Sequence, residues 1–99
     1  MEKSAPHYGL PVVKALIEAG KVRRTYAAEA GAACLGLRFS DMIEVVKALT
    51  PADFYKSMTT HADHRVWQDI YHTRTALGDE VYLKLTVINE VLIVSFKEL

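Results

Sequence analysis

Seven side chains in the second half of the chain are of types that contact phosphates and nucleobases. They alternate along three stretches rich in β-branched and aromatic residues, so each stretch places its members on one side of a β-strand. The set combines cations, an aromatic hydroxyl, an imidazole, an amide and a thioether: Lys56, Met58, Gln68, His72, Arg74, Tyr82 and Lys84. We therefore expect one open sheet face that carries all seven residues.

Cleavage of RNA is one reaction that such a face can support, because the substrate's own 2′-hydroxyl attacks the adjacent phosphate. The protein then supplies a base, an acid for the departing 5′ oxygen, and groups that stabilise charge on the phosphoryl oxygens. Lysine and tyrosine ordinarily titrate near ~10 and suit the last two tasks, whereas His72 suits proton transfer near neutral pH. The residue types do not decide which group is the base and which the acid.

Two other interpretations of this face remain open. A solvated antiparallel sheet ordinarily carries Lys, Thr, Gln and Tyr on its exposed side without any catalytic role. The same face could also belong to a noncatalytic module that docks a protein partner.

A metal site is the main competing chemistry, because His61, Asp63, His64 and His72 are potential ligands. The first three fall in a polar connection between predicted strands, and a single cysteine cannot supply the paired spacing of a structural zinc site. The sequence has no glycine-rich phosphate loop and no basic recognition helix of a DNA-binding motif. We therefore expect no metal and no cofactor.

Cys34 is expected to be an inert, buried thiol inside a helix, because it lies in an alanine-rich run. A basic cluster at Lys21, Arg23 and Arg24 could contact an RNA backbone, although charge clusters after helices are usually just solvated. These residues are secondary candidates.

Length and charge limit the remaining options. The 99 residues, 51% of them hydrophobic, predict a single domain over residues 1–99 without disulfides. No apolar run approaches the ~20 residues of a transmembrane helix, and the first residues do not resemble a signal peptide, so a cytoplasmic location is expected. Twelve basic residues balance twelve acidic ones, so any RNA contact must come from local clustering.

The first half of the chain has helical periodicity. One helix is predicted from Leu10 to a C-terminal cap at Gly20, a second over residues 27–35 that ends at Gly36, and a third capped by Ser40. Residues 50–53 resemble a capped single turn.

The second half has strand periodicity. Four strands are predicted, over residues 54–60, 66–75, 81–89 and 91–97, and short turns make the last three an antiparallel meander. Val81, Leu83, Leu85 and Val87 should face the core, opposite the open face. Helices followed by strands predict an α+β fold in which the helices pack on one side of a mainly antiparallel sheet.

The strand region closely resembles the motility quorum-sensing regulator (MqsR) toxin family. Residues 54–60, 63–64, 67–69, 71, 81–84 and 91–98 carry the match, with Pro6, His7, Val13, Gly20, Gly36 and Leu37 in register upstream. The resemblance breaks at His72, where family members carry an arginine, and the turn before Val81 is one residue longer.

The resemblance implies a RelE-like toxin fold and ribosome-independent mRNA cleavage at GCU-type sites that arrests growth under stress. It also implies neutralisation by a zinc-containing, MqsA-like antitoxin, through which any DNA binding would occur. The family's catalytic residues fall on Lys56, Gln68 and Tyr82, with Met58 beside them. His72, Arg74 and Lys84 are then expected to bind RNA, and the effect of His72 on sequence preference stays open.

Overall fold

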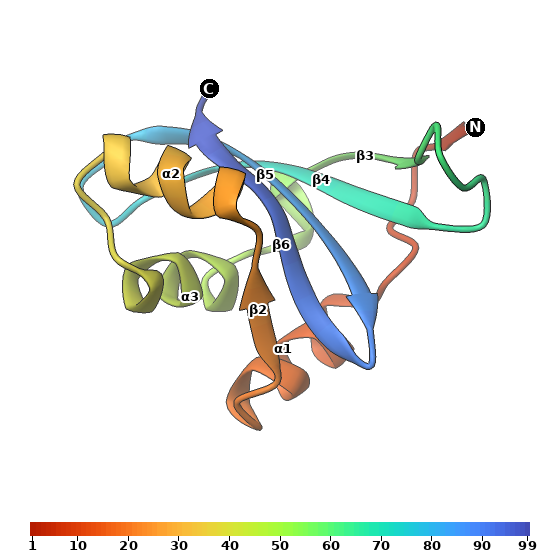
Figure 1. Ribbon diagram of the computed structural model, residues 1–99, viewed down its shortest axis with the longest axis horizontal. Coiled ribbons are helices and arrows are strands. Elements are labelled where there is room, and N and C mark those ends of the chain that lie inside the picture. The colour runs from red at the N-terminus through yellow and green to blue at the C-terminus, as the bar shows by residue number, and fades with distance from the viewer.

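The computed structural model describes residues 1–99 and contains three α-helices, one 3₁₀ turn and six strands (Figure 1). The helices are α1 (Leu10–Glu18), α2 (Tyr26–Cys34) and α3 (Phe39–Lys47), and the 3₁₀ turn is η1 (Pro51–Asp53). The strands are β1 (Glu2–Lys3), β2 (Val22–Arg24), β3 (Phe54–Thr59), β4 (Trp67–Arg74), β5 (Glu80–Ile88) and β6 (Glu90–Glu98).

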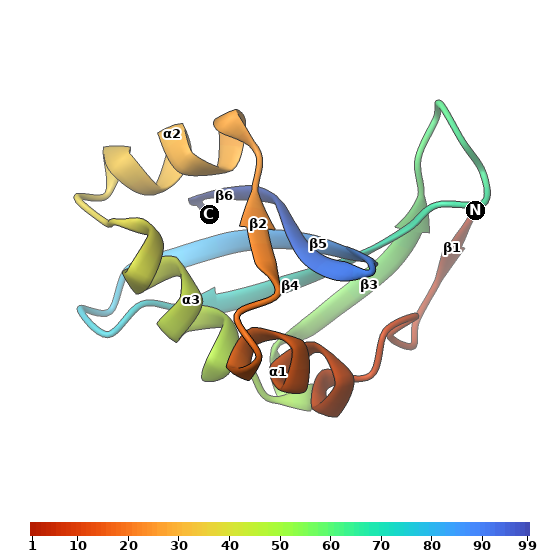
Figure 2. The ribbon, with the colours of Figure 1, turned by 60° about the horizontal axis from the view of Figure 1, so that its bottom comes forward.

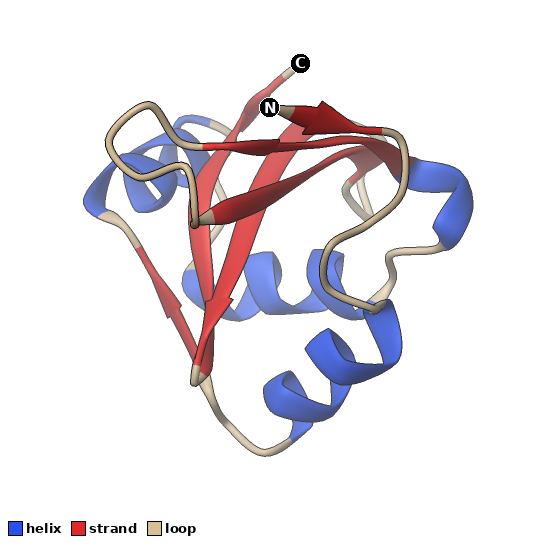
Figure 3. Cartoon of the chain, turned by 90° about the vertical axis from the view of Figure 1, so that its right-hand side faces the viewer, coloured by secondary structure: helices blue, strands red, loops and turns tan.

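All six strands form one sheet in the order β1-β3-β4-β5-β6-β2. Every neighbouring pair is antiparallel except β2 and β6, which run parallel at one edge. The sheet is visibly twisted (Figure 3). The predicted α+β fold, including the antiparallel meander of β4, β5 and β6, is confirmed.

The prediction of four strands was wrong by two. The two strands that the sequence did not predict are β1 and β2. They are two and three residues long, too short to show the alternation on which the prediction relied. Both add to an edge of the sheet, β1 to β3 and β2 to β6. Two members of the basic cluster, Arg23 and Arg24, therefore lie on an edge strand rather than in a loop.

The helix ends follow the predicted chemistry at two glycines. Gly20 and Gly36 adopt left-handed φ angles of 76° and 74°, and the residue after each donates its backbone N–H to the carbonyl oxygen five residues back, at 2.8 and 3.0 Å. The predicted cap at Ser40 was wrong. Helix α3 already begins at Phe39, because the Asp41 carboxylate accepts the backbone N–H of Arg38 at 2.8 Å.

The core lies between the helices and one face of the sheet. Fifteen buried residues form a single cluster, to which all three helices contribute, and Val81, Leu83 and Leu85 are fully buried in it as predicted. Val87 is only partly buried.

The β3–β4 connection and the N-terminus lie at the end of the molecule away from α2 and α3 (Figure 2). Cys34 corrects a prediction: it is exposed, because it is the last residue of α2.

None of these helices combines the length and the apolar character that crossing a membrane requires.

Candidate functional site on the open sheet face

Strand register arranges the predicted site residues in cross-strand rows on the face opposite the core. Directly paired residues on one face have Cβ atoms about 5 Å apart, and successive rows follow two residues along each strand. Three adjacent rows are Glu2–Met58–Gln68, Lys56–Ile70–Lys84 and His72–Tyr82–Lys97. The structure thus brings together six of the seven predicted residues, and it adds Glu2 and Lys97.

A β-bulge in β3 places one more side chain on this face. The register between β3 and β4 shifts between Phe54 and Lys56, so Tyr55 is an extra residue and both Tyr55 and Lys56 can project to the same side. The Tyr55 ring stacks on His72, with centroids 4.2 Å apart and planes 17° apart. Strict alternation places Tyr55 opposite Lys56, which is why sequence reasoning missed it.

A second bulge explains why Lys97 was missed. The register between β5 and β6 shifts by one residue after Lys84, which pairs with Ser95, whereas Leu85 pairs with Ile93. Ile93 and Phe96 are both buried in the core although they are three residues apart, an odd spacing that marks the change of phase. As a result Lys97 lies beside Tyr82, with its Nζ atom 5.1 Å from the ring centroid.

Ile70 is the apolar floor of the site. It is only 1% exposed, yet it does not belong to the core cluster on the helix side of the sheet. Its register partners are Lys56 and Lys84, whose aliphatic stems are placed to cover it while their ammonium groups remain in water. The two cations are therefore held on either side of one buried side chain.

The environment keeps both Lys56 and Tyr82 protonated. The Glu2 carboxylate lies 3.0 Å from Lys56 Nζ, and its hydrogen bond and negative charge raise the pKa of Lys56. Burial raises the pKa of Tyr82, although the nearby Lys56 charge opposes this shift. At neutral pH both groups are thus proton donors and neither is a base.

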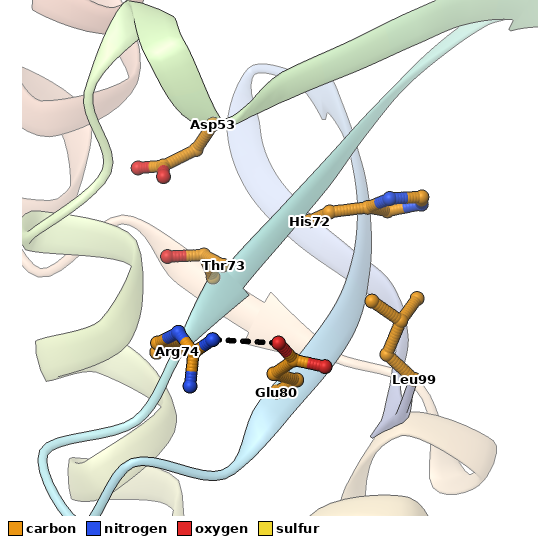
Figure 4. A pocket seen from close by; sticks show the side chains of 6 residues that line it. All are labelled: Asp53, His72, Thr73, Arg74, Glu80 and Leu99. Carbon is orange, nitrogen blue, oxygen red and sulfur yellow. Dashed lines mark hydrogen bonds and ion pairs between the residues drawn. The ribbon is translucent and has the colours of Figure 1, made fainter.

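Arg74 lies at the margin of the face and is already paired. Its guanidinium contacts the Glu80 carboxylate at 2.7 Å and the Gly78 carbonyl oxygen at 3.3 Å. Figure 4 shows this pair in a pocket, with His72 and Thr73 projecting from opposite sides of β4. The pocket is lined by Asp53, His72, Thr73, Arg74, Glu80 and Leu99.

The histidines of the β3–β4 connection do not assemble with other ligands. No group of three or more His, Cys, Asp or Glu side chains is arranged to hold a metal ion. Asp63 is instead paired with Arg65 at 3.1 Å, and that hydrogen bond holds the pKa of Asp63 below its usual range.

The fold and the site define a small α+β protein whose open antiparallel face presents lysines, a tyrosine and an amide suited to a phosphodiester. The chain belongs to the MqsR toxin family: a sequence model described as "Motility quorum-sensing regulator, toxin of MqsA" matches residues 5–98. A relative in Escherichia coli (strain K12), "mRNA interferase toxin MqsR", is 55% identical over 98 residues, which cover 99% of each chain.

Proposed function

We propose that this protein is the toxin of a toxin–antitoxin pair and acts as an endoribonuclease on mRNA through attack of the substrate's 2′-hydroxyl. The observation that carries the proposal is that Lys56 and Tyr82, both kept protonated, share one open face with Gln68. The name of the Escherichia coli relative, an mRNA interferase toxin, supports the same conclusion.

The proposed roles follow from the charge that develops during the reaction. The Lys56 ammonium and the Gln68 amide stabilise the phosphoryl oxygens, because fixed donors outside bulk water act strongly on developing charge. The Tyr82 hydroxyl protonates the departing 5′ oxygen. None of these steps requires a metal ion or a nucleophile from the protein.

The other residues of the face are proposed to hold the RNA. Met58 and His72 offer polarizable or flat surfaces to nucleobases, and Lys84 and Arg74 offer cations to flanking phosphates. Arg74 must exchange its Glu80 partner for the phosphate, so its contribution should be smaller than that of Lys84, for which no ion pair is present. GCU-type cleavage sites, a cytoplasmic location and growth arrest under stress belong to the same proposal.

We expect the purified protein to cut single-stranded RNA in excess EDTA and to leave a 2′,3′-cyclic phosphate or its hydrolysed 3′-phosphate. The 2′-hydroxyl is the nucleophile, so the phosphorus remains attached to the 3′ side. Mass spectrometry of the product ends checks the chemistry, and an RNA with a single 2′-deoxy substitution at the mapped site should resist cleavage there.

Cleavage that stops in EDTA and returns with a divalent ion would contradict the metal-free route. RNA that stays intact under all these conditions would favour the alternative, a noncatalytic module that docks a partner on the same face.

A second part of the proposal is a zinc-containing antitoxin that neutralises the protein by forming a complex with it. The family description names MqsA as the antitoxin, which supports a partner of that class here. Co-expression with such a protein should relieve growth inhibition and yield a complex that co-purifies with zinc, measurable by atomic absorption. Toxicity that no candidate antitoxin relieves would argue against this pairing.

A further inference from the structure

The carboxylate of Glu2 lies on the open face because Glu2 belongs to β1, the shortest strand of the sheet. Register places Glu2 opposite Met58, in the row that also contains Gln68. The backbone N–H of Thr59 donates to the Met1 carbonyl oxygen at 3.0 Å and holds β1 against β3. Glu2 Oε1 then lies 3.0 Å from Lys56 Nζ. The contact therefore joins two residues whose backbones are fixed by the sheet.

None of the residues assigned a catalytic role so far can be the base, and His72, the other candidate for proton transfer on this face, is stacked on the Tyr55 ring. Lys56 and Tyr82 hold their protons, and the side chains of Met58 and Gln68 have no titratable group. Of the carboxylates in register on this face, Glu80 lies at the margin in the row of Arg74, two rows from Lys56. Glu2 is the carboxylate beside Lys56, and carboxylates are established general bases in proton transfer.

We propose that Glu2 is the general base of the cleavage reaction and takes the proton from the attacking 2′-hydroxyl. This inference rests on the proposed ribonuclease function. In the step, the 2′-oxygen forms a bond to phosphorus while its proton passes to the Glu2 carboxylate. The bond between phosphorus and the 5′ oxygen breaks, and that oxygen takes a proton from Tyr82. The number of protons and the total charge are the same before and after this step. The active site returns to its starting state when Glu2 passes its proton to water and Tyr82 regains one.

The ion pair between Glu2 and Lys56 explains how the general base comes to lie near the 2′-hydroxyl. A phosphate that binds to the Lys56 ammonium occupies the position of a counter-ion, which in the free protein is the Glu2 carboxylate. The 2′-hydroxyl is on the ribose attached to that phosphate. After the phosphate displaces it from Lys56, the Glu2 carboxylate remains within one side-chain length of the 2′-oxygen, which must lose its proton.

The first test replaces Glu2 in the full-length protein. Glu2→Gln keeps an acceptor for the Lys56 hydrogen bond but cannot take up a proton, so kcat should fall about 10²-fold or more, with KM for RNA unchanged or lower. The acidic limb of the pH–rate profile should disappear, and Glu2→Asp should retain part of the rate. The matched control is Glu18→Gln, because Glu18 on α1 forms an exposed ion pair with Lys47 on α3 at 3.3 Å, away from the open face. Its rate should equal the parental rate.

The second test separates a base from an acid. In an RNA whose bridging 5′ oxygen is replaced by sulfur, the leaving thiolate departs without protonation because thiols are far stronger acids than alcohols. Tyr82→Phe should recover most of its lost rate on this substrate, whereas Glu2→Gln should remain slow. Rescue of Glu2→Gln by the sulfur substrate would overturn the assignment.

Other outcomes also decide the matter. If Glu2→Gln cleaves at the parental rate or faster, the carboxylate only competes with phosphate for Lys56 and the proposal is wrong. An acidic limb that survives in Glu2→Gln but vanishes in His72→Asn would identify His72 as the base instead. If the parental protein cleaves no RNA, the proposed function itself fails, a result distinct from failure of Glu2 alone.

Discussion

Lys56→Ala and Tyr82→Phe should each cleave RNA at least about 10²-fold more slowly than the parental protein while folding normally. Each change removes a proton donor that we propose contacts the scissile phosphodiester, and the loss of one such group typically costs that much in rate. Both residues lie on the open face rather than in the core cluster, so the melting temperature should change little. Single-turnover rates measured beside thermal melts check both halves of this expectation.

Lys47→Ala is the matched control for the lysine. Its side chain is about as exposed as that of Lys56, at 36% against 33%, and it also pairs with a glutamate, Glu18, at 3.3 Å. It lies on α3 and away from the open face, so RNA cleavage should be unaffected. Parental rates in both Lys56→Ala and Tyr82→Phe would show that the site has been misplaced.

The alternation of residue types was sufficient to predict most of the face. Lys56 and Met58 on β3, Gln68 and His72 on β4, and Tyr82 on β5 belong to regular stretches of their strands, where odd and even positions separate cleanly. The alignment of β4, β5 and β6 also follows from the short turns between them, whereas the seven residues between β3 and β4 carry no such signal. Alternation therefore predicted which side chains share the open face, and the structure supplies their pairing across β3 and β4.

The rest of the site depends on features without a local signal. Tyr55 and Lys97 reach the open face because single-residue bulges change the pleat phase of β3 and β6. Glu2 lies on the open face because it belongs to β1, a strand of two residues. The position of β1 depends on its pairing with β3, which is more than fifty residues later in the chain. Such pairing is a property of the assembled sheet, and no window of sequence around Glu2 predicts it.

One buried group shows the same dependence on assembly. Tyr71 lies between Ile70 and His72 on β4, so alternation directs it to the opposite side of the sheet, where it is fully buried in the core. Its hydroxyl, however, has no hydrogen-bond partner, and burial raises the pKa of Tyr71 to about 12. Alternation predicts the direction of a side chain, but the partners available at its far end are determined by packing.

Gly31 has a role in packing that its helix position did not reveal. From propensity alone, a glycine inside α2 weakens the helix, and replacing it with alanine should stabilise the fold by about 1 kcal/mol. A Cβ atom at Gly31 would, however, lie 1.9 Å from the carbonyl oxygen of Phe96 and 3.0 Å from its carbonyl carbon. Helix α2 therefore rests directly on the backbone of β6, just before Lys97.

Gly31→Ala should consequently destabilise the protein by about 3 kcal/mol, because the obstructing atoms are backbone and α2 must move off the sheet. At roughly 4–8 °C per kcal/mol for a chain of this size, the melting temperature should fall by roughly 12–24 °C. Gly9→Ala is the matched control, since its Cβ would meet only Pro11 Cδ, at an ordinary 3.8 Å. Thermal melts followed by circular dichroism compare the two variants. A Gly31→Ala protein as stable as the parent would mean that α2 does not approach β6 this closely, and that helix propensity decides the residue at this position.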